Sequence, residues 1–255
     1  MKSHTLGVFL FGLTTVASLS LLYGIDLGRS WIQVSGSTAK EYQLPIRRVQ
    51  RTEKKASLTF DVGQDSGPLG EILDILEEQQ ASAAFFVSGD WAAEHPREVK
   101  EIAASGQELG ICGRTYRDMT GLSGEEAREE LAETKAQVEE LAGCQVELFR
   151  PPGGEGGQRL TQSARDCGLT AVSFDVDSMD WKDYGPEDII ERVTGPEGIR
   201  EGSIVLCRTQ ARYTAEALEG ILDAAAEKGY ELVPVSELLY QEDYYIDQDG
   251  TQILR

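Results

Sequence analysis

The sequence predicts an α/β fold built on a parallel sheet, and two observations support that prediction. From Ala56 onward, short apolar runs alternate with amphipathic stretches, as expected for strands connected by helices. Glycines also stand just after the expected helices and shortly before the expected strands, where a left-handed cap is needed. These glycines are Gly106, Gly143, Gly168 and Gly229. Such a sheet is either open and doubly wound or closed as a barrel.

Seven strands are expected, each a short apolar or β-branched run between turn signals. In chain order they are Ser57–Phe60, Ala83–Val87, Leu109–Cys112, Val146–Phe149, Ala171–Phe174, Ser203–Cys207 and Glu231–Val235.

Helical periodicity is clearest after the first strand and before the last one. The i, i+3, i+4, i+7 pattern is carried by Leu69, Ile72, Leu73 and Leu76, and again by Leu218, Ile221, Leu222 and Ala225. Between them, Ser123 and Glu126 form a capping box that starts a helix ending at Gly143.

The N-terminal region predicts a membrane segment. Between Lys2 and Asp26 lie 26 − 2 − 1 = 23 residues without a formal charge, enough at about 1.5 Å per residue to cross a hydrocarbon core of about 30 Å. We interpret residues 1–28 as an uncleaved transmembrane anchor, with a cleaved signal peptide as the alternative. Residues 29–56 are then a stem and lead-in, 57–240 the barrel domain, and 241–255 a polar C-terminal tail with an Asp-Gly turn.

Composition excludes several functions. The 255 residues include 44 acidic and 24 basic side chains, giving a net charge of −20, which argues against nucleic-acid binding. The four cysteines form no C-x-x-C pair, so a zinc ribbon is excluded. The only histidines are His4 and His95.

The carboxyl ends of the expected strands carry an unusual set of charges. In both candidate architectures, the catalytic and ligand-binding residues lie at the rim formed by the carboxyl ends of the strands. The acids, arginines and cysteine expected there are Asp61, Asp90, Cys112, Arg150, Asp175, Asp177, Asp180 and Arg208.

Six motifs stand out along the chain: Leu58-Thr59-Phe60-Asp61, Ala84-Phe85-Phe86-Val87, Gly106-Gln107-Glu108-Leu109-Gly110, Phe149-Arg150-Pro151-Pro152, Asp177-Ser178-Met179-Asp180-Trp181 and Gly202-Ser203-Ile204-Val205-Leu206. In their order and spacing, over about residues 45–240, they resemble the polysaccharide deacetylase family with the NodB-homology domain. The lead-in at Leu44-Pro45-Ile46 and the Asp90-Trp91 step resemble its sporulation-associated branch. The resemblance implies a distorted (β/α)7 barrel that acts outside the membrane on N-acetylated glycans such as peptidoglycan or chitin-like chains.

Active members of that family use a divalent metal, usually zinc, and the resemblance assigns its ligands to positions that this chain has changed. Asp61 matches the catalytic base, but the metal positions hold Val62, Cys112 and Tyr116, and the acid histidine is replaced by Arg208. Zinc prefers histidine, thiolate and carboxylate ligands. No metal cofactor is therefore expected, although Cys112 leaves open a rebuilt site or a disulfide with Cys207.

The charge scaffold of the family persists. The resemblance implies that Arg150 holds Asp61, and we expect Asp180 to pair with Arg208, a cation that donates no proton near neutral pH. Further remnants of the site are Trp181 and the groove positions Pro151, Pro152, Gly153 and Asp177.

The sequence therefore predicts a membrane-anchored, catalytically inactive relative of these deacetylases in the cell or spore envelope, with the barrel outside the membrane. Its expected partners are a glycan or envelope proteins. The alternatives are an active N-deacetylase with an atypical site and a protein-binding module that uses the acidic surface or the 241–255 tail.

Overall fold

A curled, parallel sheet organises the chain in the computed structural model, which describes residues 42–63, 65 and 67–255. Within these residues the main sheet has eight strands, in the order β6-β5-β4-β3-β2-β8-β7, with β9 pairing to β2. Every pairing in it is parallel, as predicted. The strands are β2 Lys55–Asp61, β3 Ala83–Val87, β4 Glu108–Ile111, β5 Leu148–Phe149, β6 Thr170–Ala171, β7 Val176–Asp177, β8 Ile204–Arg208 and β9 Glu231–Leu232.

The predicted barrel is open on one side, because no ladder joins β6 to β7 in the described residues. Both strands are only two residues long. In a closed barrel β7 would pair with β6, but here the lead-in segment before β2 pairs beside β6 instead. Ile46 bridges to Val172, and its backbone N–H donates to the Ala171 carbonyl at 2.9 Å. The sheet is thus a half-barrel whose gap is bordered by residues upstream of β2.

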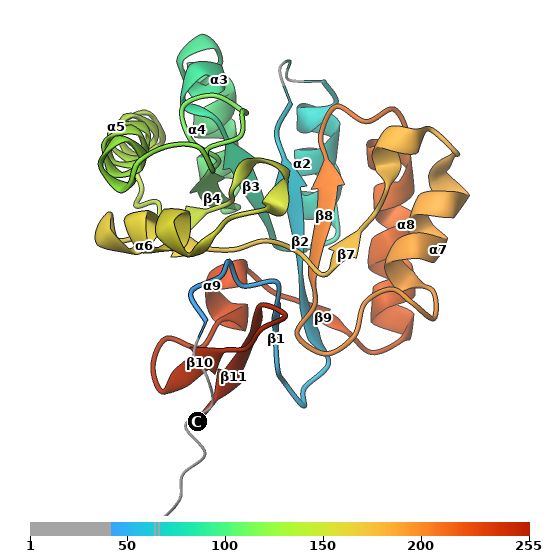
Figure 1. Ribbon diagram of the computed structural model, residues 1–255. Coiled ribbons are helices and arrows are strands. Elements are labelled where there is room, and N and C mark those ends of the chain that lie inside the picture. The colour runs from blue at the N-terminus through green and yellow to red at the C-terminus, as the bar shows by residue number, and fades with distance from the viewer. Residues whose placement is uncertain (1–41, 64, 66) are drawn as a thin grey trace, which may run out of the picture. The chain divides into compact units, whose positions relative to one another are not determined.

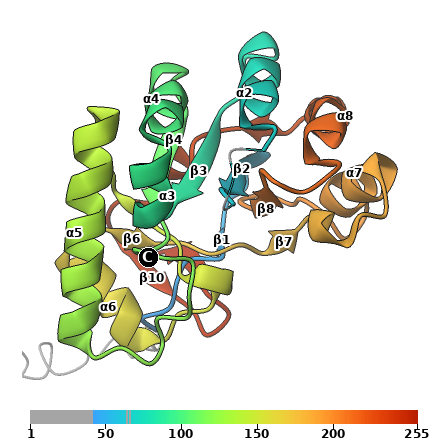
Figure 2. The same ribbon diagram turned by 90° about the horizontal axis from the view of Figure 1, so that it is seen from above.

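Helices surround the outside of this half-barrel, and Figure 2 shows α5, α4, α2, α8 and α7 along an arc outside the strands. The predicted apolar stripe on α2 is buried, as are the apolar positions of α8. The capping box before α5 and the left-handed Gly143 after it are both present. The helices are α2 Leu69–Glu78, α3 Gly89–Glu94, α4 Pro96–Ala104, α5 Gly124–Ala142, α6 Gln158–Asp166, α7 Pro186–Thr194, α8 Thr214–Glu227 and α9 Val235–Leu238.

A second, smaller sheet corrects the prediction for the C-terminus. Residues 241–255, predicted to be a polar tail, contain β10 Tyr244–Ile246 and β11 Thr251–Leu254, which pair antiparallel around the predicted Asp-Gly turn. β11 also pairs in parallel with β1 Arg48–Val49 in the lead-in (Figure 1). Two contacts hold the segment in place. Ile246 is buried with Ile46 and Val49 in a cluster on the inner face of the half-barrel. The buried side chain of Gln252 accepts the backbone N–H of Tyr240 at 2.9 Å and donates to its carbonyl at 2.8 Å.

The predicted membrane anchor, residues 1–28, and the first part of the predicted stem lie outside the described residues. Across the ranges that are described, none of the helices has the length and apolar character needed to cross a bilayer.

Candidate functional site

Asp61 lies at the carboxyl end of β2, between β3 and β8, and is 4% exposed. Arg150, which follows β5 and is fully buried, donates from Nη1 to Asp61 Oδ1 at 3.0 Å. Its Nη2 donates to the Ser173 carbonyl at 3.1 Å, and its guanidinium stacks 4.0 Å above the Phe86 ring. The predicted Asp61–Arg150 pair is confirmed, and it gives one oxygen of the carboxylate a charged donor.

Tyr116 engages the other oxygen of the carboxylate. Its hydroxyl donates to Asp61 Oδ2 at 2.6 Å and accepts the backbone N–H of Gly153 at 3.4 Å. Burial of the hydroxyl and the negative charge of Asp61 raise the pKa of Tyr116. The phenol therefore stays protonated at neutral pH, and both oxygens of Asp61 have donors.

Asp180 and Arg208 form the second predicted pair, on the other side of Asp61. Asp180 is fully buried, and its Oδ1 accepts from Arg208 Nη1 at 2.9 Å. Its Oδ2 accepts the backbone N–H of Arg208 at 2.6 Å and the hydroxyl of Thr214 at 2.8 Å. Nη1 of Arg208 also donates to Asp177 Oδ1 at 3.2 Å. Although burial opposes the charge of Arg208, these hydrogen bonds and carboxylates raise its pKa, so it is a permanent cation.

The remaining predicted site residues lie around these pairs. Gly153 sits in a short 3-10 turn, Pro152–Gly154, with a φ of +73° that favours glycine. Trp181 is 56% exposed in a second such turn, Asp180–Lys182, which is flanked by the left-handed residues Met179 and Asp183. Such backbone strain occurs often at ligand-binding segments.

A cavity of about 820 Å³ brings part of this set together, with Asp61, Tyr116 and Arg208 in its wall. Trp91 and Thr115 add apolar surface and a hydroxyl to the same wall. The predicted groove positions Pro151, Pro152, Gly153 and Asp177, and also Trp181, do not line it within the described residues. Of these five, Gly153 contacts the lining residue Tyr116, and Asp177 contacts the lining residue Arg208.

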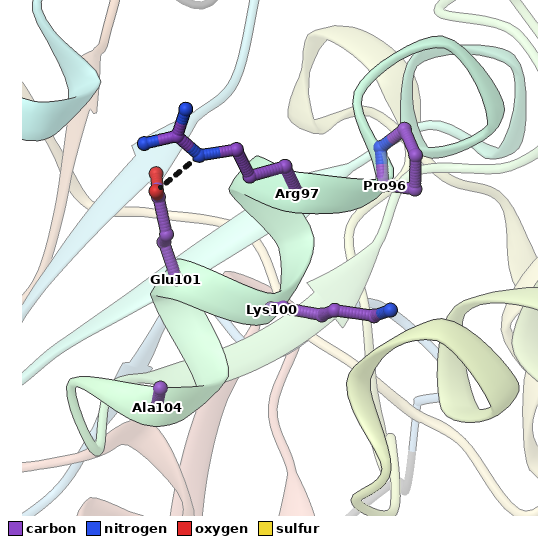
Figure 3. Close-up of a pocket in the computed structure, with 5 residues that line it drawn as sticks. All are labelled: Pro96, Arg97, Lys100, Glu101 and Ala104. Atoms are coloured by element: carbon purple, nitrogen blue, oxygen red, sulfur yellow. Dashed lines mark hydrogen bonds and ion pairs between the residues drawn. The ribbon is translucent and has the colours of Figure 1, made fainter.

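A second hollow lies on the surface of α4, and it shares no lining residue with the cavity beside Asp61. All its lining residues belong to that helix, and Figure 3 shows the side chain of Arg97 hydrogen-bonded to that of Glu101. Because no second element contributes a polar group, this hollow is no candidate active site.

The residues at the family's metal positions do not fit a zinc ion. Val62 is apolar and buried, and the fully buried Cys112 has a thiol pKa that burial raises well above its ordinary value. Zinc requires deprotonated ligands, and the hydroxyl of Tyr116 is already committed to Asp61. No group of three or more metal-binding side chains occurs in the described part of the chain. Cys112 and Cys207 are both free thiols, so the disulfide considered from the sequence is not formed.

The half-barrel with this rim is that of a polysaccharide deacetylase domain. The family profile described as "Polysaccharide deacetylase" matches residues 48–172. The peptidoglycan-N-acetylglucosamine deacetylase of Bacillus cereus is 31% identical over 196 residues, which are 75% of this chain and 91% of that relative. The chain belongs to the polysaccharide deacetylase family.

Two other relatives bear on what the site does. BA3943 from Bacillus anthracis, described as a CE4 family pseudoenzyme, superposes with a TM-score of 0.73 at 30% identity, covering 83% of this chain and 73% of that one. A mutant of BA3943 is described as having restored enzymatic activity. The peptidoglycan-N-acetylmuramic acid deacetylase PdaC of Bacillus subtilis is 32% identical over 74% of this chain, but that region is only 40% of PdaC.

Proposed function

We propose that this protein is a catalytically silent polysaccharide deacetylase that binds the N-acetylated glycan of peptidoglycan in the cavity beside Asp61. The observation that carries the proposal is the hydrogen bond from Tyr116 to Asp61 at 2.6 Å. With Arg150 on the other oxygen, the carboxylate in the position of the family's base has a donor on each side.

Proton transfer is absent from the other half of the site as well. Hydrolysis of an amide needs a group that protonates the leaving amine. Arg208 occupies that position, and its raised pKa keeps every proton on the guanidinium. The cavity nevertheless retains the size and the polar groups of a ligand site.

Isothermal titration of the purified protein with N-acetylglucosamine oligomers and peptidoglycan fragments, run beside an acetate-release assay, tests this proposal. We expect saturable binding without acetate release. Acetate released by the wild type and not by Asp61→Asn would overturn the claim of inactivity, and failure of every glycan to bind would overturn the claim of binding.

An engineered site provides a matched comparison. We expect the variant Val62→Asp/Cys112→His/Tyr116→His/Arg208→His to retain zinc through dialysis, measured by elemental analysis, where the wild type retains none. The restored activity described for a BA3943 mutant supports the view that this fold tolerates such changes.

An active N-deacetylase with an atypical site is the second candidate. It is supported by the intact Asp61–Arg150 pair and by the backbone N–H of Gly153, which points at the Tyr116 hydroxyl and has the character of an oxyanion donor. Loss of acetate release in Asp61→Asn, at unchanged glycan affinity, would support this candidate.

We also propose that residues 1–28 anchor the chain and that the barrel lies on the extracytoplasmic side, where peptidoglycan is found. The uncharged run between Lys2 and Asp26 supports the anchor. Extraction by detergent but not by carbonate, with protease sensitivity at the outer face, is the expected result. Release of a shortened form into the medium would instead indicate a cleaved signal peptide.

A further inference from the structure

The guanidinium of Arg208 has hydrogen-bond donors that the protein does not use. Of its five N–H donors, the two on Nη1 serve Asp177 and Asp180. Within the described residues, the N–H groups on Nε and Nη2 have no partner. The side chain is 21% exposed and lines the same cavity as Asp61 and Tyr116. An edge of the guanidinium is therefore available to a ligand in the cavity.

The neighbouring groups around Asp61 are also donors. The register of the sheet sets Arg208 directly beside Asp61, on adjacent parallel strands. The carboxylate oxygens of Asp61 already accept from Arg150 and Tyr116, and the oxygens of Asp180 accept from Arg208 and Thr214. Each of these oxygens already accepts at least one hydrogen bond, whereas the edge of Arg208 has unused donors, so the space beside Arg208 suits a ligand group that accepts hydrogen bonds. Asp90 and Glu94 also line the cavity and supply its other carboxylates.

An N-acetyl group and a free amine differ in this respect. The acetamide carbonyl is a neutral acceptor, whereas a protonated amine carries only donors and a positive charge. Arg208 carries a positive charge at the position where relatives are expected to handle the amine. A deacetylated sugar placed there would bring its ammonium beside the guanidinium, whose charge is already paired with Asp177 and Asp180, and would leave the unused donors of Arg208 unpaired.

We propose that Arg208 is the specificity-determining residue of this cavity: its Nε–H and Nη2–H donate to the carbonyl oxygen of an intact N-acetyl group, so that the protein retains acetylated glycan and rejects the deacetylated product. This inference rests on the proposed glycan-binding function. On this proposal, the arginine that replaces the family's acid histidine at position 208 removes the catalytic acid and also recognises the N-acetyl group.

The test is isothermal titration of the full-length protein with chitotetraose in its fully N-acetylated and its fully deacetylated form, below the pKa of the amine. The key variant is Arg208→Lys, which keeps a cation for the buried Asp180 but lacks the second donor edge. The control is Arg212→Lys, a neighbouring exposed arginine that stacks on Tyr213 and does not line the cavity.

The wild type and Arg212→Lys should prefer the acetylated oligomer, and Arg208→Lys should lose about tenfold or more of that affinity, the effect of a hydrogen bond to a charged donor. Unchanged preference in Arg208→Lys would overturn the proposal. Equal binding of both oligomers by the wild type would overturn it while leaving glycan binding in place, and binding of neither oligomer would overturn both.

Two safeguards keep the result interpretable. Thermal unfolding identifies a variant that has lost its fold, and in that case Arg208→Gln/Asp180→Asn, which removes both charges together, takes its place with the same expected loss. Glu94→Gln removes a carboxylate from the cavity wall that attracts amines. If the wild type binds the deacetylated oligomer and this variant does not, the amine is held at Glu94 and the proposal is wrong.

Discussion

Replacing Arg150 by methionine should destabilise the protein severely, because it leaves a buried carboxylate without its cation. Arg150 is fully buried, the Asp61 side chain is 6% exposed, and the two atoms of the pair are 3.0 Å apart. Removing one partner of a buried ion pair costs about 3–5 kcal/mol of unfolding free energy. For a domain of this size each kcal/mol shifts Tm by about 2–4 °C, so Arg150→Met should lower Tm by about 6–20 °C.

A surface pair of similar geometry is the control. Arg97 and Glu101 are 2.8 Å apart on α4, but the Arg97 side chain is 84% exposed. Arg97→Met should therefore change the unfolding free energy by less than about 1 kcal/mol.

Equilibrium urea unfolding followed by circular dichroism gives the free energies, and scanning calorimetry gives Tm. The variant Asp61→Asn/Arg150→Met should lose less stability than the sum of the two single changes, because the single changes each leave a buried charge alone. If Arg150→Met lost no more stability than Arg97→Met, the buried pair would contribute no more to the stability of the fold than a surface pair does.

Three further outcomes can be measured on the same protein. The absorbance of tyrosinate should show that Tyr116 ionises above the ordinary pKa of 10.0, because burial and the nearby carboxylate raise its pKa. The stability that this raised pKa contributes is complete below pH 10.0 and is lost as the pH rises through the folded-state pKa. The variant Tyr116→Phe should not show this pH-dependent loss of stability. Gly143→Ala should cost about 1–2 kcal/mol in urea unfolding because Gly143 has a φ of +71°, whereas Gly70→Ala, in helical conformation with open space around it, should stabilise the protein by about 0.5–1 kcal/mol. A thiol reagent should label the exposed Cys144 in the native state and Cys112 only after unfolding, since burial protects Cys112 and raises its pKa; equal labelling rates would contradict this.

The strands and helices with strong local patterns could be predicted from the sequence. Ala83–Val87 is a strand with the predicted bounds, and the α5 cap at Ser123 forms as expected. In contrast, β7 was not predicted, because two residues, Val176–Asp177, carry no periodicity. The hairpin of β10 and β11 was also missed, because the buried residues of β11, Thr251 and Gln252, are polar and its parallel partner is the distant strand β1.

The site, too, could be predicted only in part from the sequence. The family resemblance implied the Asp61–Arg150 pair, and charge balance suggested Asp180 with Arg208. The hydrogen bond from Tyr116 to Asp61 could not be predicted in this way, because it joins residues 55 positions apart and depends on the path of the loop after β4. The sequence indicated that a histidine was lost at that position, but only the structure gives the tyrosine a partner.

The pairing of β1 with β11 has a consequence for folding. Arg48 finds its partner at Thr251, a separation of 251 − 48 = 203 residues. Closing so long a loop has an entropic cost that is recovered only when both strands exist, so this contact forms late. Because Ile46 and Val49 lie in the inner apolar cluster next to that pairing, the half-barrel stays incomplete on its inner face until residues 251–254 have been synthesised. A nascent chain of this protein should therefore remain sensitive to protease until residues 251–254 have left the ribosome.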